Sequence, residues 1–175
     1  MLKKIVIGIV LLVLIVLGLA ALQPDNFRVQ RSIAIKAPAE KILPLISDFH
    51  NWTSWSPWEK LDPSMKRNYS GAPRDLGAVY AWEGDDKVGS GRMEITSVTQ
   101  PTNVGIKLDF LRPFESHCVT DFTLATQGDI TTVSWTMSGP SNFMTKLMGL
   151  AFSMDKMIGK DFEFGLANMK AVAEK

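Results

Sequence analysis

The C-terminal stretch from Ser141 to Lys175 is the feature that most limits how this chain can fold. It contains no proline after Pro140, and its apolar residues recur at steps of three and four, which places them on one face of an α-helix. These residues are Phe143, Leu147, Leu150, Met154, Ile158, Phe162, Leu166 and Met169. Ser141 and Asn142 can cap the first turn through their side-chain oxygens. Because an isolated helix gains little stability in water, this apolar face needs a sheet to cover it.

The same stretch is rich in glycine and methionine. Gly149, Gly159 and Gly165 each weaken a helix by up to about 1 kcal/mol relative to alanine. Five of the nine methionines also lie here, namely Met144, Met148, Met154, Met157 and Met169. Methionine adapts to irregular gaps, so two interpretations stand. The side chains either fill a helix core that kinks near residues 149–153, or form the adaptable wall of a ligand cavity.

An apolar run near the N-terminus predicts a membrane segment. Ile5 to Leu22 is 18 residues long and carries no charge, which is the lower limit for a helix that spans a bilayer. Lys3 and Lys4 precede it and predict a cytoplasmic N-terminus. We therefore expect residues 1–23 to be a single-pass anchor in the cytoplasmic membrane, with the rest of the chain on the extracytoplasmic side.

A cleaved signal peptide is the alternative interpretation of this run. Gly18 and Ala20 are small residues of the kind found at a cleavage site. The run is longer than the apolar region of a usual signal peptide, which favours the retained anchor. Residues 24–26 then form a short polar linker, and residues 27–175 form one domain.

The first part of this domain predicts one strand and two short helices. From Phe27 to Lys36 apolar residues alternate with polar ones, which indicates a strand with one buried face. Pro38 then opens a short helix, because a missing amide costs nothing in the first turn. Trp52, Trp55 and Trp58 follow at three-residue spacing, as on one side of a short helical turn. They either plug one end of the core or form an aromatic rim around a cavity mouth or at a membrane interface.

The middle of the chain predicts a run of short strands separated by turn residues. Short connections favour antiparallel neighbours. The expected strands are Lys66–Tyr69, Ala78–Glu83, Lys87–Val98, Val104–Phe110, Ser116–Thr126 and Ile130–Ser138. The pattern predicts an α+β fold, in which one antiparallel sheet wraps the final helix.

Composition excludes several kinds of site. Of the 19 basic residues two precede the apolar run, which leaves 17 against 18 acidic residues and no electrostatic case for nucleic acid. A single cysteine, Cys118, rules out an internal disulfide. Two well-separated histidines, His50 and His117, with one cysteine make a zinc site improbable in this chain. We expect no metal, no cofactor and no catalytic residue, and no feature indicates an oligomeric state.

The order of elements resembles that of the START-like or SRPBCC superfamily. The resemblance rests on Arg31–Lys41, on the Asp48–Trp58 segment with its three tryptophans, and on the Met154–Phe162 segment. It is closer to the polyketide cyclase/dehydrase-type subgroup, and it covers about Phe27 to Glu174. The resemblance implies a helix-grip fold, in which a curved antiparallel sheet of about seven strands holds a long C-terminal helix, with two short helices after the first strand. It also implies a hydrophobic cavity between sheet and helix.

Three hypotheses for function follow from this resemblance. The favoured one is a membrane-anchored domain that binds a hydrophobic small molecule or lipid. Its expected lining residues are Trp52, Trp55, Trp58, Tyr80, Arg92, Glu94, Met137, Met144, Met148 and Met154. The first alternative is an accessory or structural domain tethered to the membrane without a ligand. The second is a polyketide cyclase or dehydratase-like enzyme, which requires acid and base groups that converge inside the cavity.

Overall fold

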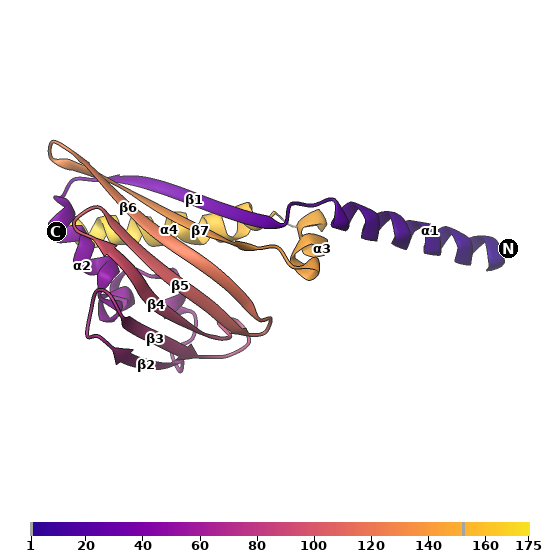
Figure 1. Cartoon of the computed structure of the whole chain (residues 1–175), viewed down its shortest axis with the longest axis horizontal. Helices are drawn as coiled ribbons and strands as arrows, with labels where there is room; N and C mark the ends of the chain where they lie inside the picture. Colours follow the sequence, from indigo (N-terminus) through magenta and orange to yellow (C-terminus); the bar gives the residue numbers. More distant parts are fainter. Residues whose placement is uncertain (1, 152) are drawn as a thin grey trace.

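A computed structural model of the chain describes residues 2–151 and 153–175. An N-terminal helix projects from one end of a sheet-and-helix domain (Figure 1). The helices are α1 (Leu2–Ala21), α2 (Ala39–Ser47), the 3₁₀ helices η1 (Phe49–Ser54) and η2 (Pro57–Lys60), α3 (Phe143–Ala151) and α4 (Met154–Ala173). The strands are β1 (Asn26–Ile35), β2 (Lys66–Gly71), β3 (Ala78–Glu83), β4 (Ser90–Thr99), β5 (Asn103–Arg112), β6 (Ser116–Gln127) and β7 (Ile130–Pro140).

The seven strands form one antiparallel sheet in the order β1-β7-β6-β5-β4-β3-β2. The last strand in the chain, β7, pairs with the first, which brings Asn26 opposite Pro140. The sheet curves, and α4 lies along its concave face with α2 beside it (Figure 1). The predicted helix-grip architecture, with its short helices after the first strand, is therefore confirmed.

The single long helix expected from the C-terminal pattern is two helices. α3 ends at Ala151 and α4 begins at Met154. The Ser153 side chain accepts a hydrogen bond from the Lys156 amide and so caps α4. The break lies where the sequence suggested a kink, and it lets α3 leave the sheet and pack beside α1.

The tryptophan segment closes the end of α2. A helix leaves its last four carbonyls without partners inside the helix. The carbonyls of Pro44, Leu45 and Ile46 accept hydrogen bonds from the side chains of Asn51, Trp55 and Trp52, at 2.9, 2.7 and 2.9 Å. The fourth carbonyl, that of Ser47, accepts from the Asp75 amide at 2.8 Å. Trp52 and Trp55 therefore terminate a helix as well as fill the core.

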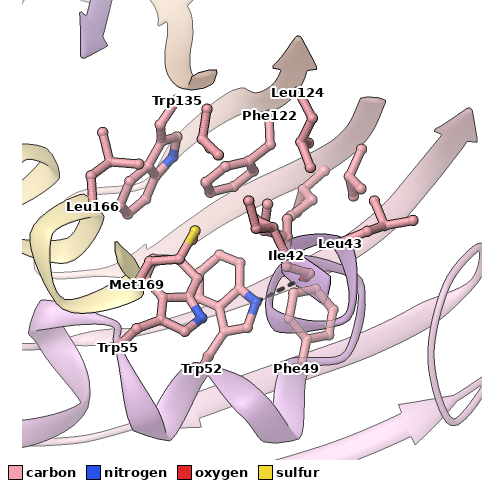
Figure 2. Close-up of a cluster of buried hydrophobic side chains, with 14 of the residues drawn as sticks. Ile42, Leu43, Phe49, Trp52, Trp55, Phe122, Leu124, Trp135, Leu166 and Met169 are labelled. Carbon is pink, nitrogen blue, oxygen red and sulfur yellow. Dashed lines mark hydrogen bonds between the residues drawn. The ribbon is translucent and has the colours of Figure 1, made fainter. Parts of the chain in front are cut away.

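Aromatic rings from the sheet and the tryptophan segment, together with Leu166 and Met169 of α4, fill the interior (Figure 2). Trp135 of β7 lies at the centre, with its ring stacked on that of Phe162 at 3.9 Å between centroids. Trp52 and Trp55 contact Trp135 edge to face. Leu166 and Met169 continue the buried face of α4. Over the C-terminal half of α4, sheet and helix thus pack directly on each other, which favours the plug interpretation for Trp52 and Trp55.

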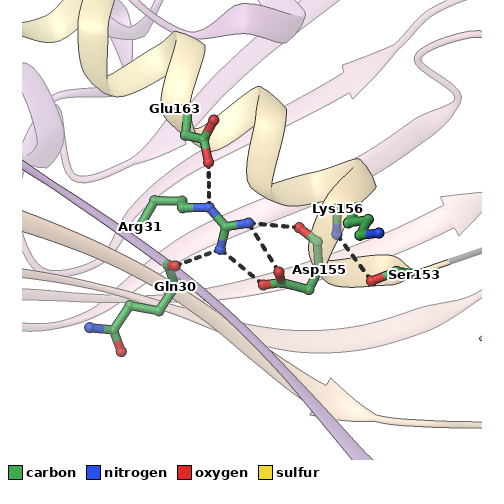
Figure 3. A network of polar contacts seen from close by, with 6 residues as sticks. All are labelled: Gln30, Arg31, Ser153, Asp155, Lys156 and Glu163. Carbon is green, nitrogen blue, oxygen red and sulfur yellow. Dashed lines mark hydrogen bonds and ion pairs between the residues drawn. The ribbon is translucent and has the colours of Figure 1, made fainter.

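Arg31 fastens the start of α4 to β1 (Figure 3). Its guanidinium donates to Asp155 Oδ1 at 2.9 Å and to Glu163 Oε1 at 2.7 Å. A third bond runs to the Asp155 carbonyl at 3.0 Å. The hydrogen bond from Arg31 lowers the pKa of Asp155 below its usual value. A cation on the otherwise apolar face of β1 therefore recruits two carboxylates from the helix.

The same contact sets a test at Gly159, which lies under the Arg31 guanidinium. A Cβ atom at this position would overlap the guanidinium group. Gly159→Ala should therefore destabilise the protein, although alanine favours a helix by up to about 1 kcal/mol. In an Arg31→Ala background the overlap is gone, and the same change should stabilise by up to about 1 kcal/mol.

Urea unfolding of the four variants measures this reversal as a double-mutant cycle. An equal effect of Gly159→Ala in both backgrounds would show that Arg31 does not hold α4 as described.

Candidate functional site

The concave face of the sheet carries a continuous set of apolar side chains at the end nearest α1. We call this set the inner strip. Register pairs join its members across the sheet: Tyr80 with Met93, Met93 with Leu108, and Leu108 with Cys118. The inner strip consists of Tyr80, Trp82, Met93, Leu108, Phe110, Cys118, Met137 and Phe27.

A wall of three aromatic rings separates the inner strip from the filled half of the interior. Trp58 of η2 lies edge to face with Trp135 and with Phe162, at 5.7 and 6.3 Å between centroids. On the α1 side of this wall, the half-buried Ile158 of α4 packs against the core, while Gly159 faces Arg31 of β1. The stacked aromatic rings of the filled half are therefore followed along α4 by the aliphatic Ile158.

A buried ionic cluster borders the inner strip at β2 and β3. Glu59 accepts a hydrogen bond from the Tyr80 hydroxyl at 2.6 Å and another from Arg67 Nε at 2.7 Å. The Glu59 side chain is only 5% exposed. Burial, and then the bond to Glu59, raise the pKa of Tyr80. The hydrogen bond to Glu59 raises the pKa of Arg67.

The polar groups of this cluster form hydrogen bonds with one another. Arg67 also donates to the carbonyls of Met65 and Glu59, at 2.8 and 3.0 Å. Among the described residues, every buried side-chain nitrogen and oxygen has a hydrogen-bond partner. The inner strip is therefore an apolar surface, and the charged groups at its border neutralise one another. Such a surface suits the binding of an apolar molecule better than proton transfer.

The structure brings together some of the predicted lining residues. Tyr80 and Met137 lie in the inner strip, and Trp58 belongs to the wall. Trp52 and Trp55 lie beyond that wall in the packed core, where they are 3% and 0% exposed. The side chains of Met144, Met148 and Met154 lie outside the described part of the chain.

Arg92 and Glu94 have no place in this site. They pair with each other at 2.7 Å, and their side chains are 40% and 36% exposed. Their neighbours Met93 and Ile95 are buried in the core. Because strand side chains alternate between faces, burial of these two apolar residues turns Arg92 and Glu94 to the convex side.

A surface groove of about 290 Å³ lies at the opposite end of the domain, between α2 and two loops. Its lining is largely polar and carries charges of both signs, which does not suit an apolar ligand. The lining residues are Glu40, Leu43, Pro44, Ser47, Asp48, Asn51, Arg74, Asp75, Gln100 and Pro101.

The Glu59 cluster was not predicted from the sequence. One signal for it exists in β2, where Arg67 and Tyr69 alternate with Lys66 and Asn68. Tyr69 stacks on Tyr80 at 5.2 Å, so Arg67 shares its inward face. An arginine on a buried strand face requires a carboxylate, but the alternation does not say which one.

Comparison with known proteins agrees with this architecture. Residues 26–174 match the model of a family described as polyketide cyclase / dehydrase and lipid transport. No curated protein sequence matches the chain.

Solved structures with the same fold cover most of the chain. Major latex-like protein 151 from Panax ginseng superposes with a TM-score of 0.62 at 12% identity, over 87% of this chain and all (100%) of that one. Protein CV1439 from Chromobacterium violaceum gives 0.59 at 14% identity, over 87% and 99%. The Aha1 dimer from Colwellia psychrerythraea gives 0.58 at 18%, over 85% and 96%. At these identities the likeness establishes the fold alone.

Proposed function

The chain belongs to the polyketide cyclase/dehydrase and lipid transport family, and from this premise we propose that it is a membrane-anchored domain that binds a hydrophobic small molecule or lipid. The ligand lies along the inner strip, between the sheet and the first half of α4. The observation that carries this proposal is the apolar character of the inner strip at the end of the sheet from which α1 departs.

The energetics of such a site require few polar contacts. Each buried CH₂ group contributes roughly 0.8 kcal/mol, so a chain of about ten carbons gains roughly 8 kcal/mol before the costs of association. Leu108, Met137 and Phe110 supply the kind of surface that this gain needs. The polar groups at the edge, Glu59 and Tyr80, already bond to each other and make no demand on the ligand.

The apolar helix α1 supports the membrane part of the proposal. Lys3–Ala21 is long and apolar enough to cross a membrane, and nearly all of its residues are exposed. At 1.5 Å per residue this helix is about 28 Å long, close to the hydrocarbon thickness of a bilayer. With Lys3 and Lys4 at its start, the domain emerges on the extracytoplasmic side.

Native mass spectrometry and solvent extraction of the full chain, purified from membranes, test the binding proposal. We expect a co-purified apolar molecule in the wild-type protein. Met137→Trp fills the inner strip and should abolish this co-purification. Val119→Trp is the matched control, because Val119 lies on β6, is 47% exposed and faces away from the core.

Urea unfolding of both variants shows whether each is folded before its ligand content is compared. A folded wild-type chain that carries no apolar molecule, or equal ligand content in the two tryptophan variants, would contradict the proposed site.

A further inference from the structure

Helix α3 presents an apolar surface at the end of the domain where α1 departs. Its nine residues include one charged residue, Lys146. The Lys146 ammonium lies 2.5 Å from Asp25 Oδ1, and its side chain is only 12% exposed. Phe143 and Leu150, in contrast, are 50% and 38% exposed. Lys146 lies on the same helix face as Phe143 and Leu150, but its ammonium pairs with Asp25 of the linker, so the exposed part of this face is apolar.

The position of α3 along α1 is fixed by contacts between the two helices. In the last two turns of α1, Ala20 is fully buried and Val16 is half-buried, at the i, i+4 spacing of one helix face. The linker is held as well, since the Ser141 amide donates to the Asp25 carbonyl at 2.7 Å. Val16 lies about 7.5 Å along the helix axis from Ala21, the end of the apolar segment. Because α3 contacts α1 and the fully buried Ala20 lies in its last turn, α3 lies beside the end of the apolar segment.

A second exposed apolar feature lies at the same end of the sheet. Strand register places the start of β1, the end of β7, the start of β6 and the end of β5 together. The β5–β6 turn therefore lies at the end from which α1 leaves (Figure 1). Leu111, next to the last residue of β5, is 56% exposed, and Phe114, in the turn, is 61% exposed.

We propose that α3 and the β5–β6 turn form a second contact with the phospholipid bilayer, in the headgroup region of the leaflet from which α1 emerges. This inference rests on the anchor assigned to α1 in the proposed function. Interfacial helices bury their apolar face about 5–10 Å into the boundary between headgroups and acyl chains. The contact of α3 with the end of α1 places α3 at this boundary when α1 spans the bilayer.

Lipid is a better occupant of this surface than a partner protein. The α1 contact places α3 at membrane depth whichever other molecule is present. The pairing of Lys146 with Asp25 leaves an apolar contact, so it should depend little on salt or on anionic lipid. The consequence is a domain held at two points, with the inner strip oriented toward the leaflet surface.

Site-specific fluorescence of the full chain in phosphatidylcholine vesicles tests this surface. In a Cys118→Ser background, single cysteines replace Phe143, Leu150 or Phe114 and carry an environment-sensitive label. Nitroxides placed near the glycerol or near the end of the acyl chain then report depth. We expect the three labels to be quenched several-fold more by the shallow nitroxide than labels at the control positions.

Leu76→Cys and Ile130→Cys are the matched controls, because these residues are 62% and 47% exposed and lie away from the α1 end. A label at Leu12, within α1, reports the anchor itself. If Leu12 is quenched by the deep nitroxide while Phe143, Leu150 and Phe114 behave like the controls, the surface is wrong and the anchor stands.

Further outcomes of the labelling experiment would overturn the lipid assignment or the anchor. Blue-shifted but unquenched labels at Phe143 would show a second copy on this surface and would overturn the lipid assignment. An unquenched Leu12, or an intact mass without residues 1–22, would overturn both the anchor and this inference. Ligand content, measured separately by extraction, distinguishes these results from failure of the binding proposal.

Discussion

Trp135→Ala is expected to lower the free energy of unfolding by about 3–5 kcal/mol. The ring is 2% exposed and stacks on Phe162, and Trp55 and Trp58 contact it edge to face. Truncation leaves a cavity where the sheet meets α4, and the indole NH also loses Thr120 Oγ1, its acceptor at 3.2 Å. Urea unfolding followed by circular dichroism measures the loss.

The control for Trp135→Ala is Phe164→Ala on the outer side of α4. Phe164 is 59% exposed, so its truncation should change stability by no more than about 0.5 kcal/mol. A Trp135→Ala protein as stable as this control would mean that sheet and helix do not pack directly at Trp135, contrary to the filled half of the interior described above.

Removal of the Glu59 carboxylate should be about as damaging. Glu59→Ala leaves Arg67 and the Tyr80 hydroxyl without their shared partner in a buried position. Breaking a buried pair from one side typically costs about 3–5 kcal/mol. Glu59→Gln keeps an acceptor for the Tyr80 hydroxyl and should lose less. The midpoint of urea unfolding distinguishes the two variants.

Two comparisons make the Glu59 prediction specific. Glu94→Ala removes an exposed partner of Arg92 and should cost no more than about 1 kcal/mol. Replacing Arg67 by methionine together with Glu59→Ala removes both charges and should recover part of the loss. Equal losses for Glu59→Ala and Glu94→Ala would show that the Glu59 cluster is not a buried ion pair.

Much of the fold was predictable because its strands have one buried face. Alternation located β1, β5 and β7 to within a few residues, and the spacing of Phe162, Leu166 and Met169 identified the buried side of α4. Such patterns show which face of each element is apolar. A sheet that wraps one helix buries all of these faces together.

The partners of polar residues were less predictable. Sequence periodicity shows which face of an element a side chain lies on, but not which residue it contacts. Arg31 interrupts the apolar face of β1, and its carboxylates Asp155 and Glu163 lie more than a hundred residues away in sequence. Arg92 and Glu94, two of the expected lining residues, alternate on β4 with Met93 and Ile95, which occupy the inner face. Because apolar spacing continues across the break at Ser153, the pattern indicated a kink there and not two separate helices.

The short linker between α1 and β1 limits how far the proposed binding domain can move from the membrane. Residues 22–25 can reach at most about 14 Å when fully extended, and Asp25 is held by Ser141 and Lys146. With α1 in a bilayer, the domain has no slack to swing into the aqueous phase toward a distant acceptor membrane. The domain then moves only by lateral diffusion at a constant distance from the bilayer. A bound apolar molecule would therefore be exchanged with the leaflet from which α1 emerges and would not be carried to another membrane.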